Sequence, residues 1–271
     1  MDHDGEDELI LATHDQGVIA VARFKDGVFT PKEIFRQPNT FIHEIEVGDI
    51  DGDQRLEFFA TPSAPNRSEA SQGGSVLWFK SNGKGGYTHQ TVASFPSRHA
   101  KEILVTDLNK DGRAELYVAL EAETRREEGA LQVVSPLEII QFIWDKGKWT
   151  NRVIATLPRG VQARVLLAGD TRGTGKPHLF VTTMRDGVWE LSPAGPGQPF
   201  EALQIDADSS GFEHAAGLAD LDQDGRPELY VAADEQDELR VHRWERGAYR
   251  TSVIYQLAHR DLTWTIEGCN L

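Results

Sequence analysis

The sequence predicts an all-β fold of five repeated units, each with four antiparallel strands, that follow one another around a ring. Three observations predict it. An acidic motif recurs every 50 to 63 residues along the 271-residue chain, runs of β-prone residues flank the copies, and no segment shows sustained helical periodicity. Radial repetition of four-stranded units gives a five-bladed β-propeller.

The acidic motif has the pattern Asp-x-Asp-x-Asp-Gly-x-x-Glu and runs into an apolar stretch. Full copies span residues 49–59, 107–117 and 220–230, and a degraded copy spans 170–180. A partial copy opens the chain at Asp2 and lacks its first ligand, which Asn270 would supply if the two ends of the chain met. The sequence therefore predicts that the C-terminal strand pairs with the N-terminal blade and closes the ring.

The strands of a unit follow in a fixed order. An apolar run precedes each motif, as at 103–105, and a β-prone run follows it, as at 116–118. The third and fourth strands form a hairpin whose glycine turn is flanked by aromatic residues able to pack across it. These pairs are Phe24 and Phe29, Trp144 and Trp149, and Trp244 and Tyr249, with Trp78 and Tyr87 and then Trp189 and Phe200 as longer versions.

The repeats divide the chain into blades of one domain, residues 1–271. The predicted blades are approximately 263–271 plus 1–40, 41–97, 98–159, 160–209 and 210–262.

Composition excludes several classes of protein. The formal net charge is −15 and no basic stripe offsets it, so we expect no nucleic-acid partner. No apolar run is long enough to span a membrane, and the acidic residues 1–8 do not have the character of a signal peptide. The single cysteine, Cys269, excludes an intrachain disulfide, and we expect a monomer.

The motif spacing indicates Ca²⁺ binding, because carboxylates at alternate loop positions and a Glu from the next strand supply the hard oxygens that Ca²⁺ prefers. Without a cation, four carboxylates within nine residues would repel one another. About four sites are expected, and the ligands are Asp2, Asp4, Glu8 and Asn270; Asp49, Asp51, Asp53 and Glu57; Asp107, Asn109, Asp111 and Glu115; and Asp220, Asp222, Asp224 and Glu228.

The loop at Asp170 is predicted to be metal-free, because Arg172, Thr174 and His178 replace three ligands. Arg172 either pairs with Asp170 and supplies the positive charge or is a solvated loop residue.

The motif followed by a strand resembles the FG-GAP / VCBS repeat of the integrin α-chain type of calcium-binding propeller, and the resemblance covers essentially the whole chain. It implies a propeller in which each acidic loop joins the first and second strands of a blade. It also implies an extracellular or periplasmic location, although five blades are fewer than integrins have.

A ligand is expected at the channel mouth opposite the acidic loops, where the innermost strands begin. The residues six positions before each motif are His43, Lys101, Arg164, His214 and Trp264. Polar side chains at a solvated channel mouth need no function, but this set can also donate hydrogen bonds and offer a stacking face.

The favoured function is a calcium-stabilised scaffold that binds a glycan, a small acid or a protein. The first alternative is a carbohydrate lyase or hydratase that uses His43, His214, Glu44 or Glu102 for acid–base chemistry. No nucleophile elbow, zinc-protease motif or phosphate loop is present, so the sequence favours binding over catalysis. The second alternative is a purely structural module or a rearranged piece of a larger extracellular protein.

Overall fold

The computed structural model describes residues 7–65, 72–195, 197–212, 214–259 and 261–268. Within these residues every regular element is a β-strand except the short 3-10 helix η1 (Asp234–Gln236), which confirms the predicted all-β class. No helix in the described part of the chain has the length and apolar character needed to cross a bilayer.

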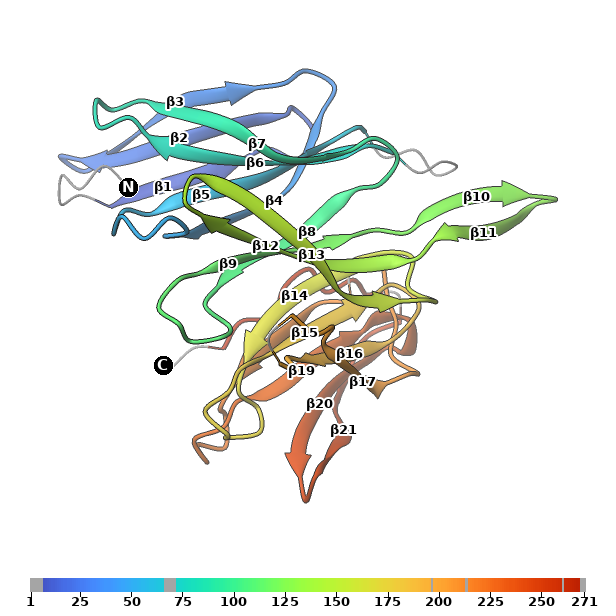
Figure 1. Ribbon diagram of the computed structural model, residues 1–271. Helices are drawn as coiled ribbons and strands as arrows, with labels where there is room; N and C mark the ends of the chain where they lie inside the picture. Colours follow the sequence, from blue (N-terminus) through green and yellow to red (C-terminus); the bar gives the residue numbers. More distant parts are fainter. Residues whose placement is uncertain (1–6, 66–71, 196, 213, 260, 269–271) are drawn as a thin grey trace.

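Four antiparallel sheets each contain four strands, ordered from the innermost strand outward (Figure 1). The first contains β4 (Phe41–Gly48), β5 (Glu57–Ser63), β6 (Gly74–Ser81) and β7 (Tyr87–Phe95). The second contains β8 (Ala100–Thr106), β9 (Glu115–Leu120), β12 (Leu137–Asp145) and β13 (Lys148–Leu157). The third contains β14 (Ala163–Gly169), β15 (His178–Thr183), β16 (Val188–Ser192) and β17 (Glu201–Asp206). The fourth contains β18 (Ala216–Ala219), β19 (Glu228–Ala233), β20 (Glu238–Glu245) and β21 (Ala248–Gln256).

Two smaller sheets complete the structure. An N-terminal sheet contains β1 (Glu8–Ala12), β2 (Val18–Lys25) and β3 (Val28–Arg36). Strands β10 (Glu123–Glu127) and β11 (Ala130–Ser135) form a hairpin that projects from the body of the molecule (Figure 1).

The four four-stranded sheets and the three-stranded N-terminal sheet pack side by side. Innermost strands contact one another in the order β4, β8, β14 and β18, and β1 contacts β4. Four hydrophobic clusters fill the four junctions between consecutive sheets, such as Phe59 and Trp78 against Leu116 at the junction of the first two four-stranded sheets. Apolar side chains on both faces of a strand are therefore buried, as Phe58 and Phe59 are on β5.

The innermost strands approach each other closely at the ends that precede the acidic loops. A Cβ atom on Gly48 would lie 2.4 Å from Cγ1 of Val105, and one on Gly169 would lie 2.6 Å from Cδ1 of Leu218. A side chain at either position would have to displace the side chain of Val105 or Leu218 on the neighbouring strand.

The C-terminal segment continues this arrangement. The residue directly before a motif faces the residue two positions before the next motif, as Gly48 faces Val105, and Ala219 faces Gly268 in the same way. Residues 266–268 therefore lie beside β18 as β18 lies beside β14. Within the described residues β1 pairs only with β2, so the predicted pairing between the C-terminal strand and the N-terminal blade is not observed there.

Three of the predicted aromatic pairs are confirmed, since Phe24 and Phe29, Trp144 and Trp149, and Trp244 and Tyr249 pair across hairpins with ring centroids 4.8 to 5.2 Å apart. The two longer pairs are wrong. Tyr87 lies opposite Ser81 while Trp78 lies opposite Gln90, and Trp189 lies opposite Gln204. The reason is that burial between sheets takes precedence: Trp78 and Phe200 belong to the clusters at the junctions.

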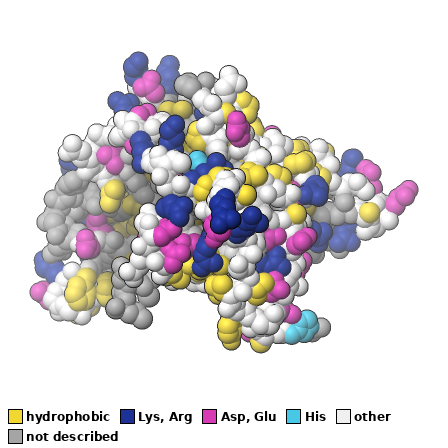
Figure 2. All heavy atoms as spheres, turned by 90° about the horizontal axis from the view of Figure 1, so that it is seen from below, with side chains coloured by type: hydrophobic (Ala, Val, Ile, Leu, Met, Phe, Trp, Pro, Cys, Tyr) yellow, Lys and Arg dark blue, Asp and Glu magenta, His cyan; other side chains and the backbone are white. Residues whose placement is uncertain are grey.

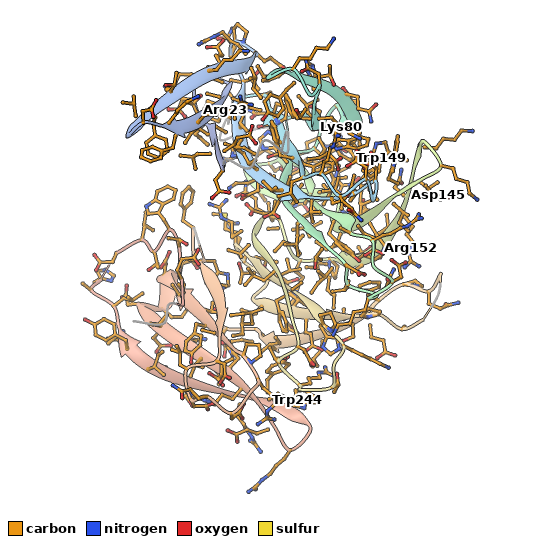
Figure 3. All side chains as sticks on the ribbon, turned by 90° about the vertical axis from the view of Figure 1, so that its left-hand side faces the viewer. Arg23, Lys80, Asp145, Trp149, Arg152 and Trp244 are labelled. Atoms are coloured by element: carbon orange, nitrogen blue, oxygen red, sulfur yellow. The ribbon has the colours of Figure 1, made fainter. Side chains whose placement is uncertain are left out.

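Trp149 ties the second four-stranded sheet to the first, because its ring contacts Trp78 at 5.3 Å and Phe59 at 6.2 Å between centroids (Figure 3). We expect Trp149→Ala to lower the free energy of unfolding by about 3 kcal/mol in urea denaturation, at the lower end for a large aromatic residue because Trp149 is only half-buried. Phe29→Ala is the matched control, since Phe29 occupies the same hairpin position but is 59% exposed. Equal losses in the two variants would contradict this role for Trp149.

Candidate functional site

Each acidic loop joins an innermost strand to the second strand of its sheet. The loops before Glu57, Glu115 and Glu228 follow β4, β8 and β18. In the loop after β8, the Asp107 carboxylate accepts hydrogen bonds from the backbone N–H groups of Asp111 and Gly112 at 3.0 and 2.8 Å. Asp220 accepts the equivalent two bonds, from Asp224 and Gly225. Asp49 accepts from Gly52 and from Gln54, so all three loops share the bond from the sixth position to the first Asp.

The turn requires left-handed backbone at its sixth position. Gly112 and Gly225 have φ of 88° there, and Gln54 adopts φ of 65° in the loop that lacks this glycine. Gln54 therefore keeps the turn at the expense of some backbone strain.

The acidic side chains of each loop converge. Asp49, Asp51, Asp53 and Glu57 place carboxylate oxygens within 4.8 Å of one another, as do Asp220, Asp222, Asp224 and Glu228, and also Asp107, Asp111 and Glu115. This set of hard oxygen donors fits a divalent cation such as Ca²⁺. Burial raises the pKa of both Glu57 and Glu115 to about 7, so a cation would also stabilise their ionised forms. The three clusters could hold metal ions.

The three clusters differ in their basic neighbours. The ammonium group of Lys80, on β6, hydrogen-bonds Asp51 and lies 3.4 Å from Glu57 and 3.8 Å from Asp53. Beside the cluster after β18, the Arg243 Nε atom lies 3.8 Å from Asp222. For the cluster after β8, no ion pair to Asp107, Asp111 or Glu115 is found among the described residues.

The predicted site at the joined chain ends falls mostly outside the described residues, since Asp2, Asp4 and Asn270 are not among them. Glu8 is described, and its side chain is 2% exposed. Its carboxylate accepts hydrogen bonds from Arg23 at 3.0 Å and from the Tyr87 hydroxyl of the neighbouring sheet at 3.2 Å.

The degraded loop holds its charges differently from the prediction. Arg172 pairs with the buried Glu190 of β16 and not with Asp170, and His178 Nδ1 lies 3.1 Å from the same carboxylate. Asp170 instead accepts the backbone N–H of Thr174 at 3.0 Å. Arg172 reaches Glu190 because its guanidinium stacks 4.0 Å above the ring of Trp244 from the next sheet.

Three β-bulges lie at the other ends of the innermost strands. The strand register shifts at His43 and Glu44 in β4, at Lys101 in β8 and at Arg164 in β14. Bulges redirect side chains, and these three are at equivalent positions in consecutive sheets. The Thr61 hydroxyl bridges the first two, because it accepts from Glu44 N and donates to Lys101 O.

The bulges bring charged groups together around the axis. His43 interacts electrostatically with Lys101 and Arg164, and its ring centroid lies 5.6 Å from that of His99. Glu102 interacts with both cations and with two further carboxylates. We call this group the axial cluster; it consists of His43, Glu44, His99, Lys101, Glu102, Glu121 and Arg164.

Two of the predicted channel-mouth residues do not join the axial cluster. His214, the residue six positions before the motif at Asp220, is fully buried, and its ring turns into the protein. Its Nδ1–H donates to Thr183 O at 2.7 Å and its Nε2 accepts from the Ser209 hydroxyl at 2.6 Å. Trp264, in the C-terminal segment, is 71% exposed.

Burial determines the protonation of the axial cluster. It raises the pKa of Glu102 to about 8 and that of Glu121 to about 7, and it lowers the pKa of His43 to about 3 and that of His99 to about 4. Near neutral pH both imidazoles are therefore uncharged, and Glu102 retains its proton.

Sequence reasoning missed three residues of these sites. Glu121 and His14 reach the axial region from segments outside the innermost strands, and the His14 ring lies 5.0 Å from that of His43. Lys80 was missed as well, because it follows Trp78 and Phe79 in the sequence, whereas Arg23 and Arg243 directly precede hairpin aromatics.

The comparison with protein-family models identifies an FG-GAP-like repeat over residues 1–60, which confirms the resemblance seen in the acidic motifs. The comparison with curated proteins gives no match.

Solved structures resemble the chain over most of its length at low sequence identity. A fungal lectin from Aleuria aurantia, described as a six-bladed β-propeller with a fucose recognition mode, shows 13% identity and a TM-score of 0.49 over 93% of this chain and 74% of that chain. The soluble aldose sugar dehydrogenase of Escherichia coli shows 12% identity and a TM-score of 0.45 over 92% and 86% of the two chains. AofleA from Arthrobotrys oligospora shows 12% identity and a TM-score of 0.40 over 93% and 92%.

The raised pKa of Glu102 predicts a pH-dependent stability. The unfolded chain releases this proton near the ordinary glutamate pKa of about 4.5, whereas the folded protein releases it near 8, so Glu102 lowers stability progressively as the pH rises between these values. Glu102→Gln mimics the protonated form and should raise the melting temperature by several degrees at pH 9 but little at pH 5, because about 1 kcal/mol corresponds to ~2–4 °C. Glu201→Gln, at an exposed position of β17, is the control. Parallel melting curves against pH for Glu102→Gln and the unaltered protein would contradict the buried, protonated state.

Proposed function

We propose that this protein is a calcium-stabilised, five-bladed β-propeller of one domain that binds a neutral glycan at the axial cluster. Calcium binding is supported by one observation: in three equivalent loops, carboxylate oxygens converge to within 4.8 Å of one another. When bound, Ca²⁺ would neutralise the loop carboxylates and fix the turns between first and second strands. Residues of these loops would act as ligands, and the ion would have a structural role.

We extend the proposal to closure of the ring by the C-terminal segment. The N-terminal sheet has three strands and lacks an innermost strand among the described residues, while residues near Gly268 lie beside β18 in the place that a further innermost strand would take. This supports a fifth blade made from both chain ends, with Asp2, Asp4, Glu8 and Asn270 around a shared ion.

The polar atoms of the axial cluster favour a neutral polyhydroxylated ligand over a small acid. His43 Nε2, His99 Nε2 and Glu121 Oε1 are buried without a hydrogen-bond partner among the described residues. Such atoms cost free energy unless a ligand or water satisfies them, and a sugar hydroxyl can both donate and accept. Glu102 keeps its proton near neutral pH, so its carboxyl group can donate a hydrogen bond to a sugar hydroxyl as well as accept one.

One observation favours the lyase alternative as a second candidate. Burial keeps Glu102 protonated near neutral pH, which is the state that a general acid needs. His214 does not support this candidate, because its ring is hydrogen-bonded within the protein away from the axial cluster. Release of unsaturated products from an oligosaccharide would favour the enzyme over the binding scaffold.

We also propose that the protein works outside the cytoplasm, where abundant free Ca²⁺ can fill sites of moderate affinity. The surface is compatible with a soluble binding partner: basic and acidic side chains lie interspersed on the face shown in Figure 2.

Removal of Ca²⁺ should destabilise the protein. Each site filled at 100 times its dissociation constant adds about 2.7 kcal/mol, so EDTA is expected to lower the melting temperature by at least 5 °C. Asp107→Asn combined with Glu115→Gln should reduce the effect of EDTA, whereas Asp145→Asn, in an exposed hairpin, should leave it unchanged. A melting curve that EDTA does not move would refute calcium stabilisation.

Glycan binding can be tested at His43. On an array of neutral and acidic glycans we expect the protein to retain neutral ones. We expect His43→Gln to weaken binding of the retained glycan by roughly 5- to 30-fold, through the loss of about 1–2 kcal/mol of hydrogen bonding. His259→Gln makes the same change at a side chain that is 78% exposed and should bind normally. Exclusive retention of acidic glycans, or equal binding by both variants, would contradict the proposed ligand or site.

A further inference from the structure

Lys80 is placed where a bound cation of the 49–57 loop would lie. Its ammonium group hydrogen-bonds Asp51 and lies within 4.0 Å of Glu57 and Asp53, three of the four carboxylates of that cluster. The ammonium also lies over the ring of Trp78, 5.0 Å from its centroid, in a cation–π contact with this almost completely buried side chain. Trp78 also contacts the ring of Trp149 at 5.3 Å between centroids; Lys80 and Trp149 are labelled in Figure 3.

The position of Lys80 follows from strand register. On β5 and β6, Phe58 lies opposite Phe79, so the next pair outward is Glu57 and Lys80. On β9 and β12, Leu116 lies opposite Phe142, so the residue facing Glu115 is Ile143. The two loops therefore have the same turn and nearly the same ligands, but one faces an ammonium group and the other faces an apolar side chain.

We infer that the Lys80 ammonium serves as the built-in cation of the 49–57 loop, so that this loop folds without a divalent ion, whereas the 107–115 loop, which has no such cation, depends on Ca²⁺. This inference rests on the proposed calcium binding and revises it at one loop. A Ca²⁺ ion entering the 49–57 cluster would have to displace Lys80 or remain within a few ångströms of a like charge.

A built-in cation also explains how four acidic side chains can lie so close together in this loop. Asp49, Asp51, Asp53 and Glu57 repel one another at short range, and Glu57 is 1% exposed, so bulk solvent cannot screen it. An ammonium group offers three donors and a full positive charge on a side chain that the fold already contains. The loop thus gains a permanent counter-ion that chelators cannot remove.

Two reciprocal substitutions test the inference. Lys80→Met keeps the length and apolar stem of the side chain but opens the 49–57 loop, and we expect the number of Ca²⁺ ions bound, counted by native mass spectrometry and calorimetry, to rise by about one. Ile143→Lys places an ammonium opposite Glu115; since Ile143 is partly exposed, the change is accommodated, and we expect the count to fall by about one. Lys84→Met, which removes a charge from an exposed position of the same hairpin as Lys80, should leave the count unchanged.

Thermal unfolding gives a second readout. In EDTA, Lys80→Met should melt below the unaltered protein, and added Ca²⁺ should restore most of the difference. The unaltered protein should respond to Ca²⁺ through its other loops only. The single variant Asp51→Asn should therefore bind as many Ca²⁺ ions as the unaltered protein. The double variant with Lys80→Met and Asp51→Asn should lose the extra ion that Lys80→Met gained.

The outcomes separate the two proposals. One outcome is that the unaltered protein binds Ca²⁺ and Lys80→Met binds the same number of ions. That outcome would overturn the role of Lys80 while leaving calcium stabilisation in place. Loss of an ion on Asp51→Asn in the otherwise unaltered protein would overturn it as well. If no variant binds Ca²⁺ and EDTA has no effect, calcium stabilisation and this inference both fail.

Discussion

The close approach of the innermost strands around the axis is the constraint on which the rest of the structure depends. At Gly48 and Gly169 the space for a side chain is occupied by Val105 and Leu218 of the next strand. Because these strands lie so close, the loops at one end and the bulges at the other end are crowded together. The acidic turns gather at one end and the axial cluster gathers at the other, so both candidate sites result from the same packing.

The acidic end must neutralise charge in every blade, and the blades do so in different ways. Arg23 and Tyr87 hold Glu8, Lys80 lies within the 49–57 cluster, and Arg172 with His178 pairs with Glu190 in the degraded loop. The 107–115 loop has an apolar residue at the corresponding cross-strand position. A single repeat can thus keep its backbone turn, which depends on hydrogen bonds to the first Asp, while its source of positive charge changes.

The axial end is governed by burial more than by the number of charged residues. Glu44, Glu102 and Glu121 surround Lys101 and Arg164, yet desolvation favours the neutral forms of the acids and of both imidazoles. Beside the cations Lys101 and Arg164, the cluster therefore offers uncharged imidazoles and a protonated Glu102, whose hydrogen-bonding atoms suit a neutral ligand. The three bulges position these groups, because each one directs a side chain that a regular strand would direct elsewhere.

The sequence by itself determined the repeat, the all-β class, the turn chemistry of the acidic loops and the hairpin pairs such as Trp144 and Trp149, because all of these depend on residues close together in the chain. Tertiary structure decided the rest. Arg172 reaches Glu190 while it stacks on Trp244 of the next sheet. Trp78 packs between two sheets and does not pair with an aromatic residue across its hairpin. His214 turns inward to Ser209 and Thr183. Lys80 faces Glu57 only because of strand register, which joins residues far apart in the chain. Contacts between strands and between sheets set where a charged side chain goes, and the spacing within one motif carries no information about them.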